Sequence, residues 1–289
     1  MRVPRHFLAA LLTTAITTIA ACTPTGRPEP PLVDAAPPAT TTTAEPTVST
    51  PATAPARVEQ VTITPAVRAA VDAADRSATD RALDPGRHPA ETLSFLGITP
   101  SAKVAELGAG GGYTAELLAR IVGPSGTVYG QNSAFILERF AEAPWSERLT
   151  KPLMKPVVRV DRPFDDPLPP EAKELDAVLM LFFYHDTFWM GVDRDAMNRA
   201  VFRALKPGGV YGILDHSGRP GTGTSEVKTL HRIEEQVVRE EIERAGFKLA
   251  AEATFLRNPD DPRDWNASPS AAGEKRGQSD RFVLKFVKP

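Results

Sequence analysis

Apolar residues recur with two different periods along the chain from Val58 onward. Short runs with the pattern of strands alternate with longer stretches in which apolar residues return every three or four positions, as in helices. This alternation is typical of a parallel sheet whose strands are joined by helices. We therefore expect one α/β domain over residues 58–289.

Seven segments are predicted to be strands, five of them parallel and the last two an antiparallel pair. They are KVAEL (103–107), TVYGQ (127–131), VVRVD (157–161), LDAVLMLFF (175–183), VYGILDH (210–216), LAAEATF (249–255) and RFVLKFV (281–287). The last two are separated by about two dozen residues rich in Pro, Gly and polar side chains, a length more typical of functional than of inert loops.

Helices are predicted between these strands and ahead of them. Thr64 followed by Pro65 combines a capping residue with proline at the first helical position, which predicts a cap or lid helix over residues 65–83. The remaining helices are expected at residues 90–97, 113–123, 135–141, 193–205 and 225–245. In the last of these Val227, Leu230, Ile233, Val238 and Ile242 share one face.

The first 21 residues have the pattern of a secretion signal. Arg2 and Arg5 precede an apolar stretch that ends at Ala21 and is too short for a membrane span. The following Cys22 is the only cysteine, and Ile19-Ala20-Ala21-Cys22 resembles the bacterial lipobox, in which the cysteine receives a lipid. We expect an exported protein anchored by Cys22, although a free thiol is the alternative.

Residues 22–57 are dominated by Pro, Thr and Ala and contain no aromatic side chain, so we expect an extended tether. The lipobox resemblance implies a place at the cell envelope, on the periplasmic face. In a Gram-negative cell Thr23 after the cysteine makes the outer membrane the default. Removal of Arg2 and Arg5 leaves 34 − 2 = 32 basic against 36 acidic residues, a net charge of −4, which argues against nucleic acid as a partner.

A glycine-rich turn carries the clearest chemistry. The strand ending at Leu107 runs into GAGGG (108–112), which opens a helix at Tyr113, and Glu106 stands two residues before the first glycine. Glycines let the backbone approach a ligand closely. A dinucleotide-binding turn would have G-x-G-x-x-G spacing and a pyrophosphate at the helix start. A carboxylate would repel that pyrophosphate but complements an ammonium group, which favours S-adenosylmethionine (SAM).

This turn resembles the first motif of class I SAM-dependent methyltransferases, and VFRALKPGGVYGILDH (201–216) resembles their stretch from the fourth crossover helix into the fifth strand. From about Asp80 to the end, the chain is similar to a family of predicted bacterial methyltransferases. The segments that carry this similarity are RHPAETLSFLG, YHD, DHSGRPGTG, LHRIEE and the terminal DRFVLKFVKP. The resemblance implies a Rossmann-like seven-stranded sheet with an antiparallel last strand, helices on both faces and an N-terminal cap helix.

The resemblance also implies which residues hold SAM. The glycine turn would contribute Glu106, Gly108, Ala109, Gly110, Gly112 and Tyr113. After the second strand, where the family usually has an acid for the ribose hydroxyls, this chain has Gln131 and Asn132, whose amides can bond a hydroxyl without charge assistance. Asp161 is expected at the adenine amino group, with Leu181 and Phe182 as an apolar wall.

Histidines supply the candidates for the acceptor side. Three of them, His88, His185 and His216, fall in loops at the carboxyl edge of the predicted sheet, where open α/β folds bind ligands. His185 is the first candidate for a general base, with Asp186 or Asp215 orienting it. The acceptor pocket is expected to be lined by Arg87, His88, Tyr184, His216 and Arg219.

A metal site built from these histidines is an alternative, as in cation-dependent O-methyltransferases, but no pair has ligand spacing within one helix or hairpin. We therefore expect no metal. The sequence predicts transfer of the SAM methyl group to an O or N atom of a small molecule. The alternative is a non-catalytic exported ligand-binding protein with the same fold, because SAM is made in the cytoplasm.

Overall fold

The computed structural model describes residues 57–289. The predicted signal peptide, Cys22 and the tether up to residue 56 lie outside the described residues. Arg57, the last residue of the predicted tether, begins the first strand. Within the described part of the chain, no helix is both long and apolar enough to cross a membrane.

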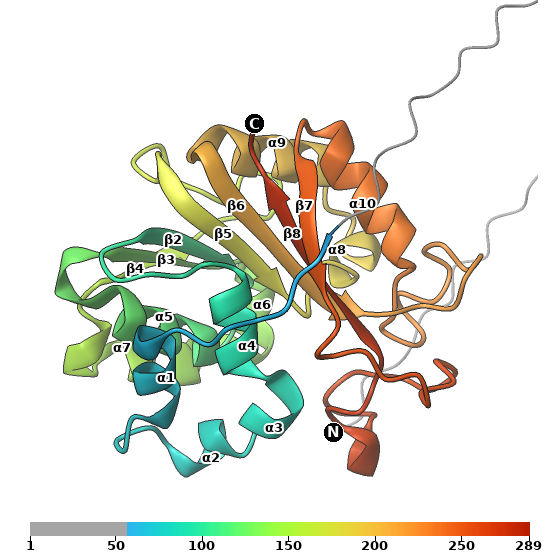
Figure 1. The fold of residues 1–289 in the computed structure, drawn as a ribbon, viewed down its shortest axis with the longest axis horizontal. Helices are drawn as coiled ribbons and strands as arrows, with labels where there is room; N and C mark the ends of the chain where they lie inside the picture. Colours follow the sequence, from blue (N-terminus) through green and yellow to red (C-terminus); the bar gives the residue numbers. More distant parts are fainter. Residues whose placement is uncertain (1–56) are drawn as a thin grey trace, which may run out of the picture. The chain divides into compact units, whose positions relative to one another are not determined.

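The domain is built on one eight-stranded sheet with the order β1-β7-β8-β6-β5-β2-β3-β4 (Figure 1). Strand β8 runs antiparallel to β6 and β7, and every other neighbouring pair is parallel. The strands are β1 (Arg57–Val58), β2 (Lys103–Leu107), β3 (Thr127–Asn132), β4 (Val157–Asp161), β5 (Leu175–Leu181), β6 (Leu205–His216), β7 (Lys248–Ala253) and β8 (Arg281–Val287).

The predicted Rossmann-like sheet is thus confirmed, with one more strand than expected. The additional strand β1 pairs with β7 through Arg57 and Val58 alone. Two residues are too few to show a hydrophobic period, so the sequence pattern carries no signal for this strand.

The helices lie on both faces of the sheet (Figure 1). They are α1 (Pro65–Asp72), α2 (Ala78–Arg81), α3 (Asp84–Arg87), α4 (Pro89–Phe95), α5 (Tyr113–Val122), α6 (Ala134–Ile136), α7 (Glu142–Leu149), α8 (Asp186–Trp189), α9 (Arg194–Ala204) and α10 (Glu235–Arg244). A π-helical turn over Leu137–Ala141 joins α6 to α7.

Alternation along the central strands divides the core into two layers. In β2, Ala105 and Leu107 face one hydrophobic cluster together with residues of α7 and α9, whereas Val104 faces a second cluster with residues of α1, α4 and α5. Because successive side chains of a strand point to opposite faces, a strand covered on both sides must be apolar at nearly every position. This requirement explains the apolar run over residues 177–181 of β5 and the apolar side chains of β2, where Glu106 is the buried exception.

The predicted helix over residues 65–83 is wrong in its length. Thr64 caps α1 as expected, since its side chain accepts a hydrogen bond from the Val67 N–H. The helix then ends at Asp72, because the buried Arg76 guanidinium donates to the Val71 carbonyl at 2.7 Å and forms an ion pair with Asp84. Residues 65–87 therefore form three short helices.

The predicted helix over residues 225–245 is also wrong, because α10 begins only at Glu235. Ile233 is held in an extended bridge beside β6: its N–H donates to the His216 carbonyl at 3.0 Å, and its own carbonyl accepts from Gly218 at 2.7 Å. These bonds to the end of a distant strand replace the helical ones. Residues 225–234 consequently form turns, among them His231 with φ +50°.

Candidate active site

The two loops that carry the predicted chemistry lie side by side. Strands β2 and β5 are neighbours, and Leu107 pairs with Met180 near their carboxyl ends. The chain continues from β2 to one edge of the sheet, through β3 and β4, and then returns to β5 on the other side of β2. In open α/β sheets, ligands bind at such a point of reversal.

The glycine turn after β2 has the backbone conformation that only glycine adopts readily. Gly108, Gly110 and Gly112 have φ of +71°, +54° and +83°. A Cβ at Gly112 would lie 2.4 Å from the Trp145 ring, so this glycine is required for packing. A Cβ at Gly110 would meet no atom within 4 Å, so the space beside this residue is open for a ligand.

Glu106 is a buried carboxyl group beside this turn. Only 4 % of the residue is exposed, and its Oε2 has no hydrogen-bond partner within the described structure. Burial raises the pKa of Glu106 to about 8, although a hydrogen bond from Thr114 and the charge of Arg87 oppose the shift. An unpartnered buried carboxyl oxygen fits a cationic ligand group.

The amides of Gln131 and Asn132 do not have the position expected for binding a ribose. Gln131 Oε1 accepts from the Gly108 N–H at 3.0 Å, and its amide donates to the Arg162 carbonyl. Asn132 binds both the N–H and the carbonyl of Gly110, at 2.8 and 3.1 Å. Both side chains are fully buried and stabilise the glycine turn. An amide can serve both groups of one residue, whereas a carboxylate could only accept.

Arg87, predicted on the acceptor side, lies instead at the glycine turn. Its guanidinium is 4.5 Å from the ring centre of Tyr113 and 5.8 Å from that of Phe182. These three residues and Leu181 line a cavity of about 10 Å³, which has room for one water molecule. Burial lowers the pKa of Arg87, and among the described residues no carboxylate lies within ion-pair distance of it.

Two other predicted cofactor residues are placed as follows. Ala109 is buried and its N–H donates to the Gln131 carbonyl at 2.8 Å, which fixes the turn against β3. Asp161 ends β4 with an exposed side chain and forms an ion pair with Arg159 at 2.9 Å. It is accessible at the carboxyl edge, where the adenine was expected.

His185 forms a buried pair with Asp215, one of the two carboxylates predicted to orient it. Asp215 is fully buried at the end of β6, and its carboxylate accepts from the His185 ring Nδ1 at 2.7 Å and from the His185 backbone N–H at 2.8 Å. Two bonds to one carboxylate fix both the position and the orientation of the ring. Asp186 follows directly, and its Oδ1 lies 3.2 Å from the other ring nitrogen, Nε2.

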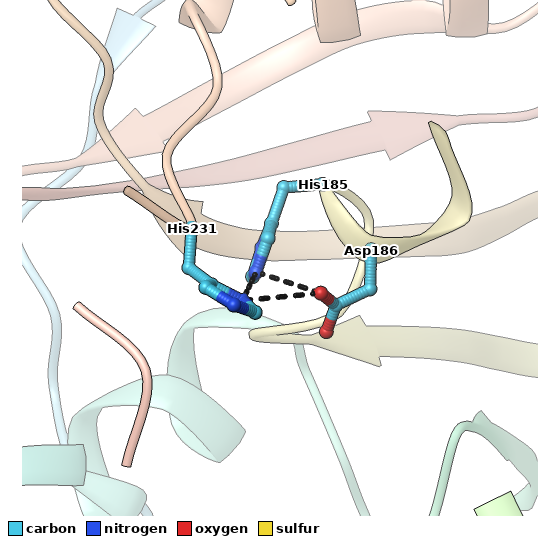
Figure 2. A group of neighbouring side chains, drawn as sticks. All are labelled: His185, Asp186 and His231. Atoms are coloured by element: carbon cyan, nitrogen blue, oxygen red, sulfur yellow. Dashed lines mark hydrogen bonds and ion pairs between the residues drawn. The ribbon is translucent and has the colours of Figure 1, made fainter. Parts of the chain in front are cut away.

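His231 completes this group and was missed by sequence reasoning. Its Nδ1 lies 3.2 Å from His185 Nε2 and 3.2 Å from Asp186 Oδ1 (Figure 2). The predicted helix over residues 225–245 placed His231 away from the loops at the sheet edge. The motif LHRIEE was the available signal, because it contains this histidine.

The protonation of His185 differs from that of a general base. Burial disfavours the charged ring, but the Asp215 and Asp186 carboxylates outweigh burial and raise the pKa of His185 to about 10. With both nitrogens facing carboxylates, the ring is a proton donor at neutral pH. The expected neutral base is therefore not the form found in this arrangement.

The remaining predicted acceptor residues are only partly brought together. His216 joins the cluster, with its ring centre 5.9 Å from that of His185 and 5.4 Å from that of Phe182. Burial lowers the pKa of His216 well below its usual value, so it is neutral. His88 lies apart, stacked on Phe255 and 3.6 Å from Glu91.

Tyr184 and Arg219 do not line the site. Tyr184 is fully buried and points into the core, where its hydroxyl donates to Glu241 and accepts from Asn198. Arg219 is half exposed and forms an ion pair with Glu226.

Comparisons with known proteins agree with this geometry. The model of the protein-L-isoaspartate(D-aspartate) O-methyltransferase (PCMT) family matches residues 46–143, which include the glycine turn. No curated protein matches the sequence significantly. The fold is similar to that of a SAM-dependent methyltransferase from Aquifex aeolicus, with a TM-score of 0.52 and 17% identity over 72% of this chain and 93% of that one.

Two further structures have similar folds. One is the methyltransferase bound to the Trm112 activator of Haloferax volcanii, with a TM-score of 0.50 and 18% identity over 77% of this chain and 97% of that one. The other, assigned as a sarcosine dimethylglycine methyltransferase, is from Galdieria sulphuraria, with a TM-score of 0.50 and 18% identity over 73% and 84%. From its strand order, its glycine turn and these likenesses, residues 57–289 have the Rossmann-like fold of class I SAM-dependent methyltransferases.

Proposed function

We propose that this domain binds SAM and transfers its methyl group to an O or N atom of a small molecule. The observation that carries the proposal is the unpartnered Glu106 Oε2, buried beside a glycine turn with open space at Gly110. SAM carries an ammonium group that would satisfy this oxygen. When bound, it supplies an electrophilic methyl group.

Arg87 and Glu106 suit the two charged ends of an amino acid, because a bound ammonium group would favour the ionised form of Glu106 over the protonated form that burial favours. In our proposal the Glu106 carboxylate binds the ammonium of the methionine part, and the Arg87 guanidinium binds its carboxylate. Arg87 has no carboxylate partner among the described residues, so this bond would complete its pairing.

The acceptor would lie beside His185 and Asp186. Methyl transfer requires in-line alignment of the attacking atom and removal of its proton. His185 would donate a hydrogen bond that orients the acceptor. Of the two carboxylates, Asp186 is the one that an acceptor can reach, since its side chain is 14 % exposed whereas that of Asp215 is fully enclosed. Contacts with His185 and His231 outweigh burial and lower the pKa of Asp186, so it would accept a hydrogen bond from the acceptor rather than act as a strong base. Two carboxylates here favour a neutral or cationic acceptor over the carboxyl group that the name of the PCMT family implies.

A specific observation favours a second candidate, a non-catalytic binding protein with the same fold. The buried amides of Gln131 and Asn132 bind the glycine turn and, through Gln131, the Arg162 carbonyl, so neither is positioned to hold a ribose. A domain that has lost this contact would bind SAM weakly or bind another ligand.

Calorimetric titration with SAM separates the two candidates. We expect wild type to bind one equivalent and Gly110→Ala to lose binding, because the new methyl group occupies the open space of the turn. The control is Gly97→Ala: Gly97 also has positive φ, +75°, and open surroundings, but it lies at the end of α4. Because alanine is strained at positive φ, both substitutions should lower the free energy of unfolding by the same amount, about 1 kcal/mol.

The control should bind SAM like wild type, and both variants should retain the circular dichroism of the folded domain. Absence of any heat with wild type at millimolar SAM would favour the non-catalytic candidate. Equal binding by Gly110→Ala and wild type would place the ligand elsewhere.

A further inference from the structure

Three potential metal-ligand atoms meet at the carboxyl edge of the sheet. His185 Nε2, Asp186 Oδ1 and His231 Nδ1 are each 3.2 Å from the other two. Figure 2 shows the side chains converging from two segments, the loop after β5 and the turn before α10. Segments 45 residues apart in the sequence, from Asp186 to His231, thus contribute to one small triangle.

Hydrogen bonding alone accounts poorly for this triangle. Seen from one corner of an equilateral triangle, the other two corners lie 60° apart, so a single N–H can point straight at only one of them. Only the contact between the two histidines has hydrogen-bond geometry, and the two contacts with Asp186 are ion-pair distances. Three polar atoms are therefore closer together than their protons can satisfy.

The same spacing suits a shared cation. Ligand atoms bound to one zinc ion at about 2.0–2.1 Å are about 2.9 Å apart at a right angle and about 3.3 Å apart at the tetrahedral angle. The observed 3.2 Å lies between these two values. The three atoms therefore have the spacing of ligands around one ion, which would displace the proton from His185 Nε2 when it binds.

The surroundings of the triangle are those of a metal site. His185 binds the Asp215 carboxylate through Nδ1 at 2.7 Å, which leaves Nε2 aimed at the triangle. Metal-binding histidines almost always donate their second ring nitrogen to such a carboxylate. Asp186 is oriented by Trp189, whose indole N–H donates to Oδ1 at 2.7 Å. His231 is next to Arg232, which a buried ion pair fixes to Asp261.

The geometry points to a binding site for one divalent transition-metal ion at His185, Asp186 and His231. Two imidazoles and one carboxylate suit Zn²⁺ or Fe²⁺ and disfavour Mg²⁺ and Ca²⁺, which prefer oxygen ligands. Three protein ligands leave at least one coordination position free. The His231 side chain is 24 % exposed, so this position can be reached from solvent. The site does not depend on SAM, and it reverses the sequence-based expectation of no metal.

Metal binding by the full chain tests the inference directly. Protein stripped with a chelator is dialysed against Zn²⁺ or Co²⁺, and bound metal is measured by mass spectrometry and by the visible absorption of Co²⁺. We expect one equivalent, which millimolar Mg²⁺ or Ca²⁺ does not displace. His231→Ala and Asp186→Asn should each weaken affinity by at least about 100-fold, and Asp215→Asn by about 10–100-fold through the orientation of His185.

His88→Ala is the matched control, because it removes a histidine outside the triangle and should leave one equivalent bound. Circular dichroism identifies any variant that fails to fold. If either His231→Ala or Asp186→Asn does not fold, the other still tests the site. Unchanged affinity in both folded ligand variants, or no metal bound by wild type, would overturn the inference. A SAM titration on the same samples distinguishes this failure from failure of the proposed function, since SAM binding does not require the ion.

Discussion

At the scale of single residues, two buried glutamates of neighbouring elements have opposite environments. Glu106 has one oxygen without a partner, and burial raises its pKa to about 8. Glu116 is as deeply buried, but hydrogen bonds from Lys151, Arg120 and Arg148 outweigh burial and lower its pKa. The unsatisfied carboxyl group is the one beside the glycine turn, as expected if a ligand completes it.

Glu106→Gln should stabilise the domain and abolish SAM binding. In the unfolded chain Glu106 loses its proton near pH 4.5, whereas in the folded domain it keeps the proton up to about pH 8. The free energy of unfolding therefore falls as the pH rises from 4.5 to about 8. Glutamine removes this loss, so the variant should gain up to about 4 kcal/mol relative to wild type at pH 8 and much less at pH 5. Urea unfolding at both pH values measures the difference.

Glu116→Gln is the contrasting control and should lower stability at pH 8, because Lys151 loses its carboxylate partner and Arg120 and Arg148 each lose one of their two. Equal pH dependence of Glu106→Gln and wild type would show that Glu106 is already ionised in the folded protein.

At the scale of elements, the long connection between β7 and β8 determines where His231 lies. Asp261 in this connection accepts hydrogen bonds from the Arg232 guanidinium and from the N–H groups of Arg263 and Asp280. Arg232 is fully buried and directly follows His231. One carboxylate therefore joins the connection, the turn before α10 and the start of β8.

Asp261→Ala should lower the free energy of unfolding by about 3–5 kcal/mol, because it leaves the Arg232 charge buried without its partner. Denaturant unfolding measures the loss. Asp195→Ala is the comparison, since its ion pair with Arg244 is half exposed and should contribute less than about 1 kcal/mol. Similar losses in the two variants would mean that the Arg232–Asp261 pair does not hold the connection.

At the scale of the whole molecule, the proposed membrane attachment depends on Cys22, which lies outside the described residues. We expect the full chain to be found with the membrane fraction of the producing cell and to require detergent for extraction. Cys22→Ser should be soluble or retain its first 21 residues, because no lipid can then be attached. Fractionation followed by mass spectrometry of the N-terminus measures both. Wild type released without detergent would contradict the anchor.

The sequence predicted seven of the eight strands of the sheet because their signal is local. A strand buried on both faces must be apolar at nearly every position, and Val104, Ala105 and Leu107 of β2 and residues 177–181 of β5 meet this requirement without reference to any other segment. The glycine turn is equally local, since positive φ at Gly108, Gly110 and Gly112 is a property of the residues themselves. Fold class and the position of Glu106 followed from these two signals.

Only the tertiary structure decided which polar groups meet. Residues 225–234 have helical periodicity, but hydrogen bonds of Ile233 to His216 and Gly218 hold them in turns and bring His231 to His185. Asn132 follows the second predicted strand, where a side chain that binds the ribose was expected, but its amide binds the N–H and the carbonyl of Gly110. Such partners come from distant parts of the chain, and hydrophobic periodicity records whether a side chain is buried but not which polar atom it will meet.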